Sequence, residues 1–259
     1  MPDLSIIIVS YNARADLERC LAALHADPPR TPHEIVVVDN QSADGSAEAA
    51  RRWSGVRVID AGSNLGFARA NNIGIRETTG RNVLLLNSDT VVPAGAIDQL
   101  VNDLERRPDV AVAGPRLVDA AGRAELSFGR MIGPWNELRQ KMIARGAVDR
   151  ATRREHSPDW VSGACLLVRR GDAEAVGLLD ERYFMYIEDV DFCAALRARG
   201  RRILFTPRAE VVHLRGRSAA TAPRATEGAY RRSQIAFYEK HHPRWARILR
   251  WYLALRRRL

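Results

Sequence analysis

The stretch that decides the fold is Val83-Leu84-Leu85-Leu86-Asn87-Ser88-Asp89-Thr90-Val91. Its four consecutive apolar residues predict a strand that is buried on both faces, as strands of parallel sheets are. The strand ends in a polar trio with one carboxylate, Asp89. Because ligands of open α/β sheets bind beyond the carboxyl ends of the strands, Asp89 is placed to hold a divalent metal ion, which can in turn hold a diphosphate. The alternative is an aspartate that only caps the turn before Pro93 and the helix that follows.

Strands and helices alternate on both sides of this stretch. Further buried strands are predicted at 4–10, 34–39 and 56–59. Helices are predicted between the strands, at 14–26, at 46–53 and through 71–75. This β-α-β-α-β-α-β order calls for a parallel sheet with right-handed crossovers. A helix at 94–107 and a strand at 110–114 continue it.

Three of the predicted strands bring polar residues to the same edge of the sheet. These tips are Ser10-Tyr11-Asn12, Asp39-Asn40 and Asn87-Ser88-Asp89. Together they indicate a nucleotide site. The chain has neither the phosphate loop of ATPases nor a G-x-G-x-x-G after the first strand, which argues against ATPases and ordinary dinucleotide-binding proteins. A metal at Asp89 would supply the charge that a glycine-rich loop otherwise provides.

The second half of the chain is less regular at first. From 119 to 158 the pattern predicts a mobile or acceptor-side insertion, with a helix around 135–145. A strand follows at 160–169, in which Gly163 allows a ligand to approach closely. Short strands are predicted at 201–205 and 210–213.

Three acidic residues, Glu188, Asp189 and Asp191, lie in or before the first turn of a helix predicted to run to Arg199. Acidic residues are common there because they complement the helix dipole. The alternative is that one of them is a general base close to the predicted metal and diphosphate site.

Composition and charge narrow the class of protein. The 259 residues, 46% of them hydrophobic, suffice for one large domain with or without an appendage. Cys20, Cys165 and Cys193 suggest neither a disulfide framework nor a zinc site, as expected in a reducing cytosol. Nearly all of the net charge of +9 lies in 231–259, which holds nine Arg or Lys and one acid. No apolar run is long enough to span a bilayer, and no signal peptide is recognisable.

Six short segments carry a resemblance to a known family. They are Ile8-Val9-Ser10-Tyr11-Asn12, Val38-Asp39-Asn40-Gln41-Ser42-Ala43-Asp44-Gly45, Asn64-Leu65-Gly66-Phe67-Ala68, Leu86-Asn87-Ser88-Asp89, Trp160-Val161-Ser162-Gly163-Ala164 and Tyr186-Ile187-Glu188-Asp189-Val190-Asp191. In this order they resemble the family 2 inverting glycosyltransferases of the GT-A fold, in particular the bacterial rhamnosyltransferase-like branch. The resemblance covers residues 4–216.

This resemblance implies an α/β fold of the GT-A type, with a Rossmann-like, mostly parallel sheet flanked by helices. Residues 1–118 would form the nucleotide-sugar-binding half, and 119–225 the acceptor-side and catalytic-base half of the same domain. Residues 226–259 would form a basic, amphipathic helical tail. The implied reaction moves a sugar from a nucleoside diphosphate donor to an acceptor hydroxyl in cell-surface polysaccharide or glycolipid synthesis. Resemblance to the rhamnosyltransferase-like branch favours L-rhamnose, from dTDP-L-rhamnose, as the sugar.

The resemblance also implies roles for single residues on the donor side. The donor would be held by Ser10, Tyr11, Asn12, Asp39, Asn40, Ser42, Asn64, Gly66, Phe67, Asn71, Asn87 and Ser88. Asp89 would bind Mg²⁺ or Mn²⁺ as the last Asp of the family's Asp-x-Asp motif, whose first Asp is replaced here by Asn87. His213 resembles the family's late histidine that contacts the metal or diphosphate, although a histidine that is merely satisfied at a strand end fits equally well.

On the acceptor side, the resemblance makes Asp189 the expected base, with Glu188 and Asp191 as supporting or rival candidates. A single displacement needs one base and charge stabilisation on the leaving diphosphate, but no covalent nucleophile. Trp160 would stack on a sugar, or else be a core residue, and Gly163 would line the acceptor side.

The C-terminal residues 244–259 predict an amphipathic helix. Its apolar face would hold Trp245, Ile248, Leu249, Tyr252, Leu255 and Leu259, opposite several arginines. Such a helix favours an anionic membrane surface, which would place a cytoplasmic protein at the inner face of the cell membrane, near a glycan or lipid-linked acceptor. The alternative is packing on the domain or on a second protomer, and the sequence leaves the oligomeric state open.

Two other functions compete with glycosyl transfer. A sugar-phosphate nucleotidyltransferase should carry a Gly-rich, basic loop after the first strand, which 10–13 is not. A non-catalytic adaptor could hold a nucleotide-sugar or nucleic acid through the basic tail. The acidic cluster at 188–191 argues against a nucleic-acid partner.

Overall fold

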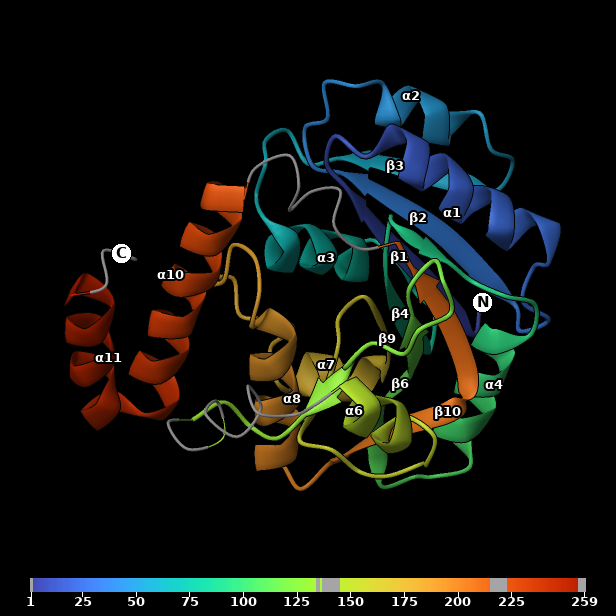
Figure 1. Ribbon diagram of the computed structural model, residues 1–259. Helices are drawn as coiled ribbons and strands as arrows, with labels where there is room; N and C mark the ends of the chain where they lie inside the picture. Colours follow the sequence, from blue (N-terminus) through green and yellow to red (C-terminus); the bar gives the residue numbers. More distant parts are fainter. Residues whose placement is uncertain (1, 134–135, 137–144, 215–222, 256–259) are drawn as a thin grey trace.

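The computed structural model describes residues 2–133, 136, 145–214 and 223–255. An eight-stranded sheet with the order β3-β2-β1-β4-β9-β6-β10-β5 forms its centre (Figure 1). The first four strands in the chain are parallel neighbours in it: β1 (Leu4–Ser10), β2 (His33–Asp39), β3 (Val56–Asp60) and β4 (Asn82–Asn87). The predicted parallel arrangement of these strands is confirmed, and their carboxyl ends meet at one edge.

The apolar run of β4 is buried on both faces because alternate residues face two different cores. Leu84 and Leu86 belong to the core under α1 (Arg14–Ala26), α2 (Ser46–Arg51) and α4 (Ala96–Glu105). Val83 and Leu85 belong to the core under α3 (Phe67–Arg76), α7 (Arg170–Ala175) and α8 (Glu188–Ala198). All four are at most 1% exposed. Helices therefore cover both faces of the sheet.

The remaining strands make the sheet mixed. β9 (Cys165–Arg169) runs antiparallel between β4 and β6 (Val110–Val118). β10 (Arg202–His213) is parallel to β6, and β5 (Thr90–Val91) pairs antiparallel with its end. The β-α-β pattern of the first half indicated a continuous run of parallel strands. In the structure this run ends at β4, and the sheet continues beyond it with the antiparallel strand β9.

Two predicted strand boundaries in the second half were wrong. The strand predicted at 160–169 is interrupted at 162–164, because β8 (Trp160–Val161) leaves the main sheet and pairs with β7 (Phe128–Gly129). The two short strands predicted at 201–205 and 210–213 are one strand, β10, whose register shifts between Thr206 and Glu210. The helix predicted around 135–145 falls almost entirely outside the described residues, and α6 (Arg145–Ala151) begins where it would end.

The described part of the chain ends in two helices at the side of the molecule, α10 (Pro223–His241) and α11 (Pro243–Leu255). α10 contacts α8, and α11 packs on the outer side of α10 (Figure 1). They share a third apolar cluster with the segment before α8, formed by Tyr183, Ile187, Val190, Phe237, Tyr238 and Ala246. A C-terminal helical segment is thus confirmed, although it consists of two helices. No described helix has both the length and the apolar character needed to cross a membrane.

Candidate active site

Asp89 lies in the turn between β4 and β5, and the pairing of β5 with β10 determines what it faces. Thr90 is opposite His213 in that pairing. The Nε2 atom of His213 consequently lies 3.3 Å from Oδ1 of Asp89, while its Nδ1 lies 3.2 Å from Oε2 of Glu125. The backbone N–H of Leu214 donates to the carbonyl of Asp89 at 2.8 Å. The two predicted metal ligands therefore lie together at the end of the sheet.

This pair can contribute to a cation site but cannot enclose a cation. Within the described residues, no group of three or more His, Cys, Asp or Glu is arranged to hold a metal. Mg²⁺ and Mn²⁺ are commonly bound by one or two protein side chains together with water and substrate phosphates. The carboxylate of Asp89 with the imidazole of His213 fits such a shared site. Glu125, by accepting from Nδ1–H, would hold the tautomer that leaves Nε2 available to a metal.

The tips of β1 and β2 are joined to each other at the same edge. The N–H of Asn12 donates to Oγ of Ser42 at 3.0 Å, and Oδ1 of Asn12 accepts from the N–H of Ala43 at 2.7 Å. One oxygen of Asp39 accepts from the N–H of Ser42 at 3.0 Å. Its other oxygen, Oδ1, and the hydroxyl of Ser10 are buried without a hydrogen-bond partner in the described structure. These two atoms are thus available to a ligand.

A loop at 64–67 joins these tips to the segment before α8. The side-chain amide of Asn40 donates to Oδ1 of Asn64 at 2.9 Å, and Oδ1 of Asn40 accepts from the N–H of Leu65 at 2.8 Å. At the far end of the loop, the N–H of Phe67 donates to the carbonyl of Phe184 at 2.7 Å. Gly66 makes this contact possible, because a Cβ there would lie 2.3 Å from the carbonyl oxygen of Phe184.

The remaining predicted donor residues are distributed along the same edge. The side-chain N–H of Asn71 donates to the carbonyl of Phe67 at 2.9 Å, and its Oδ1 is buried with no partner in the described part of the chain. Oδ1 of Asn87 is likewise buried with no hydrogen-bond partner in the described residues. Tyr11 is 47% exposed at the tip of β1, and Ser88 is half-buried in the turn after β4.

Asp189 is brought to this region by the interruption between β8 and β9. Its Oδ2 accepts from the N–H of Gly163 at 2.8 Å, and its Oδ1 accepts from the N–H of Val190 at 2.8 Å. The next residue, Ala164, accepts through its carbonyl from the N–H of Asn87 at 3.0 Å. Two consecutive residues thus contact the base candidate on one side and the end of β4 on the other. Asp189 and the end of β4 at Asn87, two residues before Asp89, therefore contact the same short segment.

The two rival acids differ from Asp189. Glu188 is buried and its Oε2 has no partner in the described structure, so burial, together with the nearby charge of Asp189, raises the pKa of its carboxyl well above the usual range. Asp191 is 1% exposed and faces α10. Its carboxylate accepts from Lys240 Nζ at 2.7 Å, His241 Nε2 at 2.6 Å and the hydroxyl of Tyr183 at 3.2 Å. Of the three acids, Asp189 is the one bonded to Gly163.

Trp160 is half-buried between two apolar clusters, and its Nε1–H donates to the carbonyl of Arg130 at 2.9 Å. This is the environment of an anchored core residue, and stacking on a sugar stays a prediction. Sequence reasoning missed Glu125, Phe184, Lys240 and His241. No spacing rule relates them to the motifs, since they reach the site only through the packing of β10, the 64–67 loop and α10.

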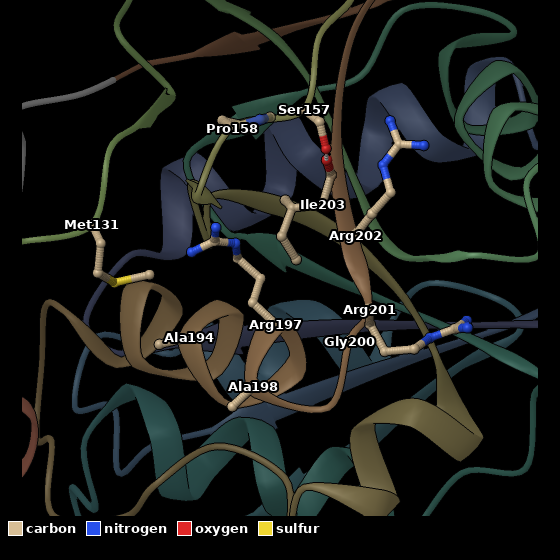
Figure 2. A pocket seen from close by; sticks show the side chains of 10 residues that line it. All are labelled: Met131, Ser157, Pro158, Ala194, Arg197, Ala198, Gly200, Arg201, Arg202 and Ile203. Atoms are coloured by element: carbon tan, nitrogen blue, oxygen red, sulfur yellow. Dashed lines mark hydrogen bonds between the residues drawn. The ribbon is translucent and has the colours of Figure 1, made fainter.

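A separate cavity of about 520 Å³ lies at the C-terminal end of α8 (Figure 2). It contains none of the predicted site residues. Three arginines contribute to its wall, but each already pairs with a carboxylate: Arg197 with Asp159, Arg201 with Asp172 and Arg202 with Asp109. Its positive charge is therefore compensated within the protein.

Comparison with known proteins gives the family. The sequence profile of glycosyl transferase family 2 matches residues 5–171. The chain therefore belongs to glycosyl transferase family 2 and is a nucleotide-sugar-dependent glycosyltransferase. The family and fold expected from the sequence are confirmed, and the nucleotidyltransferase and adaptor alternatives have no support among these relatives.

Its relatives include rhamnosyltransferases. N-acetylglucosaminyl-diphospho-decaprenol L-rhamnosyltransferase of Mycobacterium tuberculosis is 34% identical over 96% of this chain and 89% of the relative. Rhamnosyltransferase WbbL of Escherichia coli is 25% identical over 80% of this chain and 82% of the relative. Among solved structures, mannosyltransferase PcManGT of Pyrobaculum calidifontis, in complex with GDP-Man and Mn²⁺, has a TM-score of 0.66. The two chains are 19% identical, and the superposition covers 96% of this chain and 68% of the mannosyltransferase chain. This similarity supports the GT-A fold.

The buried Glu188 predicts a pH-dependent stability difference. The unfolded carboxyl ionises above pH ~4.3, while the folded one keeps its proton, so stability falls as the pH rises towards the raised folded pKa. Glu188→Gln removes this loss. The free energy of unfolding of Glu188→Gln minus that of wild type, both measured in urea, should therefore increase from pH 4 to pH 7. The same change at the exposed Glu48 is the control, and parallel pH curves for Glu188→Gln and wild type would contradict the prediction.

Gly66 and Gly62 form a matched pair for testing the contact with Phe184. Both have positive φ, +82° and +73°, but a Cβ at Gly62 meets nothing within 4 Å. Gly62→Ala should cost about 1–2 kcal/mol through its left-handed backbone alone. Gly66→Ala should cost about 1–3 kcal/mol more, because its backbone (φ +82°, ψ 174°) is nearly restricted to glycine and because the new methyl overlaps the carbonyl of Phe184. Denaturant unfolding measures both, and equal losses would show that the contact is not formed.

Proposed function

We propose that this glycosyltransferase moves L-rhamnose from a nucleoside diphosphate donor to a hydroxyl of a glycan or lipid-linked acceptor, with inversion at the transferred carbon. The sugar is supported by the rhamnosyltransferase relatives, of which the mycobacterial one aligns with almost the whole chain. Its name specifies an acceptor carried on a polyprenyl diphosphate. A role in cell-surface polysaccharide or glycolipid synthesis follows from that similarity.

The donor is proposed to lie along the edge formed by the tips of β1, β2 and β4. The support is chemical: buried oxygens of Ser10, Asp39 and Asn71 lack partners in the described structure, although such atoms are normally satisfied. The hydroxyls and ring N–H groups of a nucleoside or sugar would satisfy them. Asp39 is proposed to bind the base or ribose, and the 64–67 loop to line the donor.

Mg²⁺ or Mn²⁺ is proposed to be held by Asp89 and His213. The related mannosyltransferase structure contains Mn²⁺ together with its nucleotide-sugar. When bound, such an ion supplies positive charge to the leaving diphosphate. With Asn87 in place of a second carboxylate, this chain offers one negative charge fewer, so tight binding is proposed to need the diphosphate itself.

Asp189 is proposed as the general base. The observation that carries this assignment is its hydrogen bond with Gly163, which orients the carboxylate beside the end of β4. Its oxygens retain lone pairs for the acceptor hydroxyl. As that proton passes to Asp189, the acceptor oxygen forms a bond with the anomeric carbon and the bond from this carbon to the diphosphate breaks. Glu188 is buried with a raised carboxyl pKa, and Asp191 is bound to Lys240 and His241, so both are proposed to be less suited to this role.

Asp189→Asn tests the base directly. The single side-chain oxygen of the variant can still accept from the N–H of Gly163, although its amide group then faces the N–H of Val190. Because this side chain cannot take up a proton, transfer from a panel of nucleotide-sugars should fall about 10²- to 10⁴-fold. Binding of the nucleoside diphosphate, measured by calorimetry, should not change. Asp27→Asn, at an exposed position, is the control. Full transfer activity in Asp189→Asn would refute the assignment.

We further infer that α11 rests on an anionic membrane surface. Its exposed apolar side chains are Trp245, Ile248, Trp251, Tyr252 and Leu255. Arg244, Arg247 and Arg250 on the same helix are exposed, and each is worth about 1 kcal/mol near anionic lipid. The predicted apolar face needs one change, since Leu249 packs against the protein while Trp251 is 68% exposed. Leu259 lies outside the described residues.

A double variant, Ile248→Ser with Trp251→Ser, tests this membrane contact without disturbing the buried side of α11. Wild type should float with liposomes that contain anionic lipid, and the variant should float markedly less, because two exposed apolar anchors are lost. Liposomes of neutral lipid are the control. Equal flotation of the two proteins would refute the inference, and sedimentation of the free proteins shows whether the face instead joins two copies.

A further inference from the structure

The turn that leads into α8 has an unfavourable backbone. Tyr186 and Ile187 have φ of +69° and +71°, and Ile187 is β-branched. Positive φ is rare for such residues and costs free energy, so it persists only where the surroundings hold it. The turn directly precedes Glu188 and Asp189. Whatever holds the turn therefore sets where Asp189 lies.

The turn is held from two sides. On the donor side, the carbonyl of Phe184 accepts from the N–H of Phe67. On the other side, α10 contacts it: the hydroxyl of Ser233 donates to the carbonyl of Met185 at 2.8 Å. The ring of Phe237, which is fully buried, belongs to the same apolar cluster as Ile187.

Charge ties α10 to α8 one turn further on. Asp191 is buried, and a buried carboxylate is costly unless its charge is paired and hydrogen-bonded. Two consecutive residues at the end of α10 provide this pairing, Lys240 and His241. Lys240 also donates to Asp180 at 2.8 Å, just before the turn. The last turn of α10 thus contacts Asp180, which precedes the turn at 184–187, and Asp191, which follows it.

We propose that Lys240 and His241 are positioning residues for glycosyl transfer. They hold Asp191, and through it the turn at 184–187 and the first turn of α8, so that Asp189 stays against Gly163. This inference rests on the proposed role of Asp189 as base. It makes α10 a part of the catalytic unit instead of an appended tail, and it gives Asp191 a structural role in the reaction.

The experiment compares the full-length Lys240→Met, His241→Gln and Lys240→Arg variants with wild type. Two readouts are used: kcat and the KM for the nucleotide-sugar, and hydrogen exchange of the peptide that covers residues 183–191. Glu239→Gln is the matched control, because it removes the exposed pair of Glu239 with Arg250 on the same helix. Thermal unfolding identifies which variants are folded.

Lys240→Met and His241→Gln should lower kcat about 10- to 100-fold, since small displacements of a catalytic group have effects of this size. The KM for the donor should not change, and exchange in 183–191 should accelerate. Lys240→Arg should recover most of kcat, and Glu239→Gln should behave as wild type. Unchanged exchange in the folded variants would overturn the proposal, as would faster exchange with an unchanged kcat or a rise in KM alone.

The two proposals fail in different ways. Full transfer activity in Asp189→Asn would refute the assignment of Asp189 as the base. Hydrogen exchange in 183–191, in contrast, measures whether α10 stabilises this segment, whichever group takes the proton. If Lys240→Met does not fold, His241→Gln and Lys240→Arg still give both readouts.

Discussion

The hydrogen bond from the N–H of Gly163 to Asp189 is the contact on which the site depends. It joins α8 to the interruption between β8 and β9, and the adjacent Ala164 carbonyl joins that interruption to the end of β4. A side chain at Gly163 would lie 3.3 Å from Cβ of Asp189 and 3.4 Å from the ring of Phe67. Glycine therefore lets Asp189 and the 64–67 loop approach the segment between β8 and β9 closely.

Three acidic residues within one helical turn acquire different properties from what packs against them. The helix dipole favours negative charge at all three. Burial raises the pKa of the Glu188 carboxyl, backbone N–H groups orient Asp189, and Lys240 and His241 of α10 contact the carboxylate of Asp191. The chemistry of the site therefore depends on helices that are distant in the sequence, and α10 is as much a part of it as the sheet.

Sequence pattern predicted the features that depend on local burial. The run Val83–Leu86 had to be buried on both faces, and this identified the parallel strands and the polar tips that follow them. Pattern did not show that β9 runs antiparallel, because an apolar run reports burial and not direction. Nor did it show that Lys240 and His241 meet Asp191, since ion pairs between distant segments leave no periodicity. The apolar face of α11 was misjudged at Leu249 and Trp251 because the packing of α10 selects which side is covered.

We propose that one cleft holds the diphosphate at Asp89 and the reacting carbon at Asp189. A crystal structure of the protein with a nucleoside diphosphate and Mn²⁺ tests it most directly, with the ion located by its anomalous signal. We expect the ion between Asp89, His213 and the diphosphate, with the nucleoside against Asp39 and the end of the diphosphate facing Gly163 and Asp189. A nucleotide bound elsewhere, or an ion far from Asp89, would contradict it.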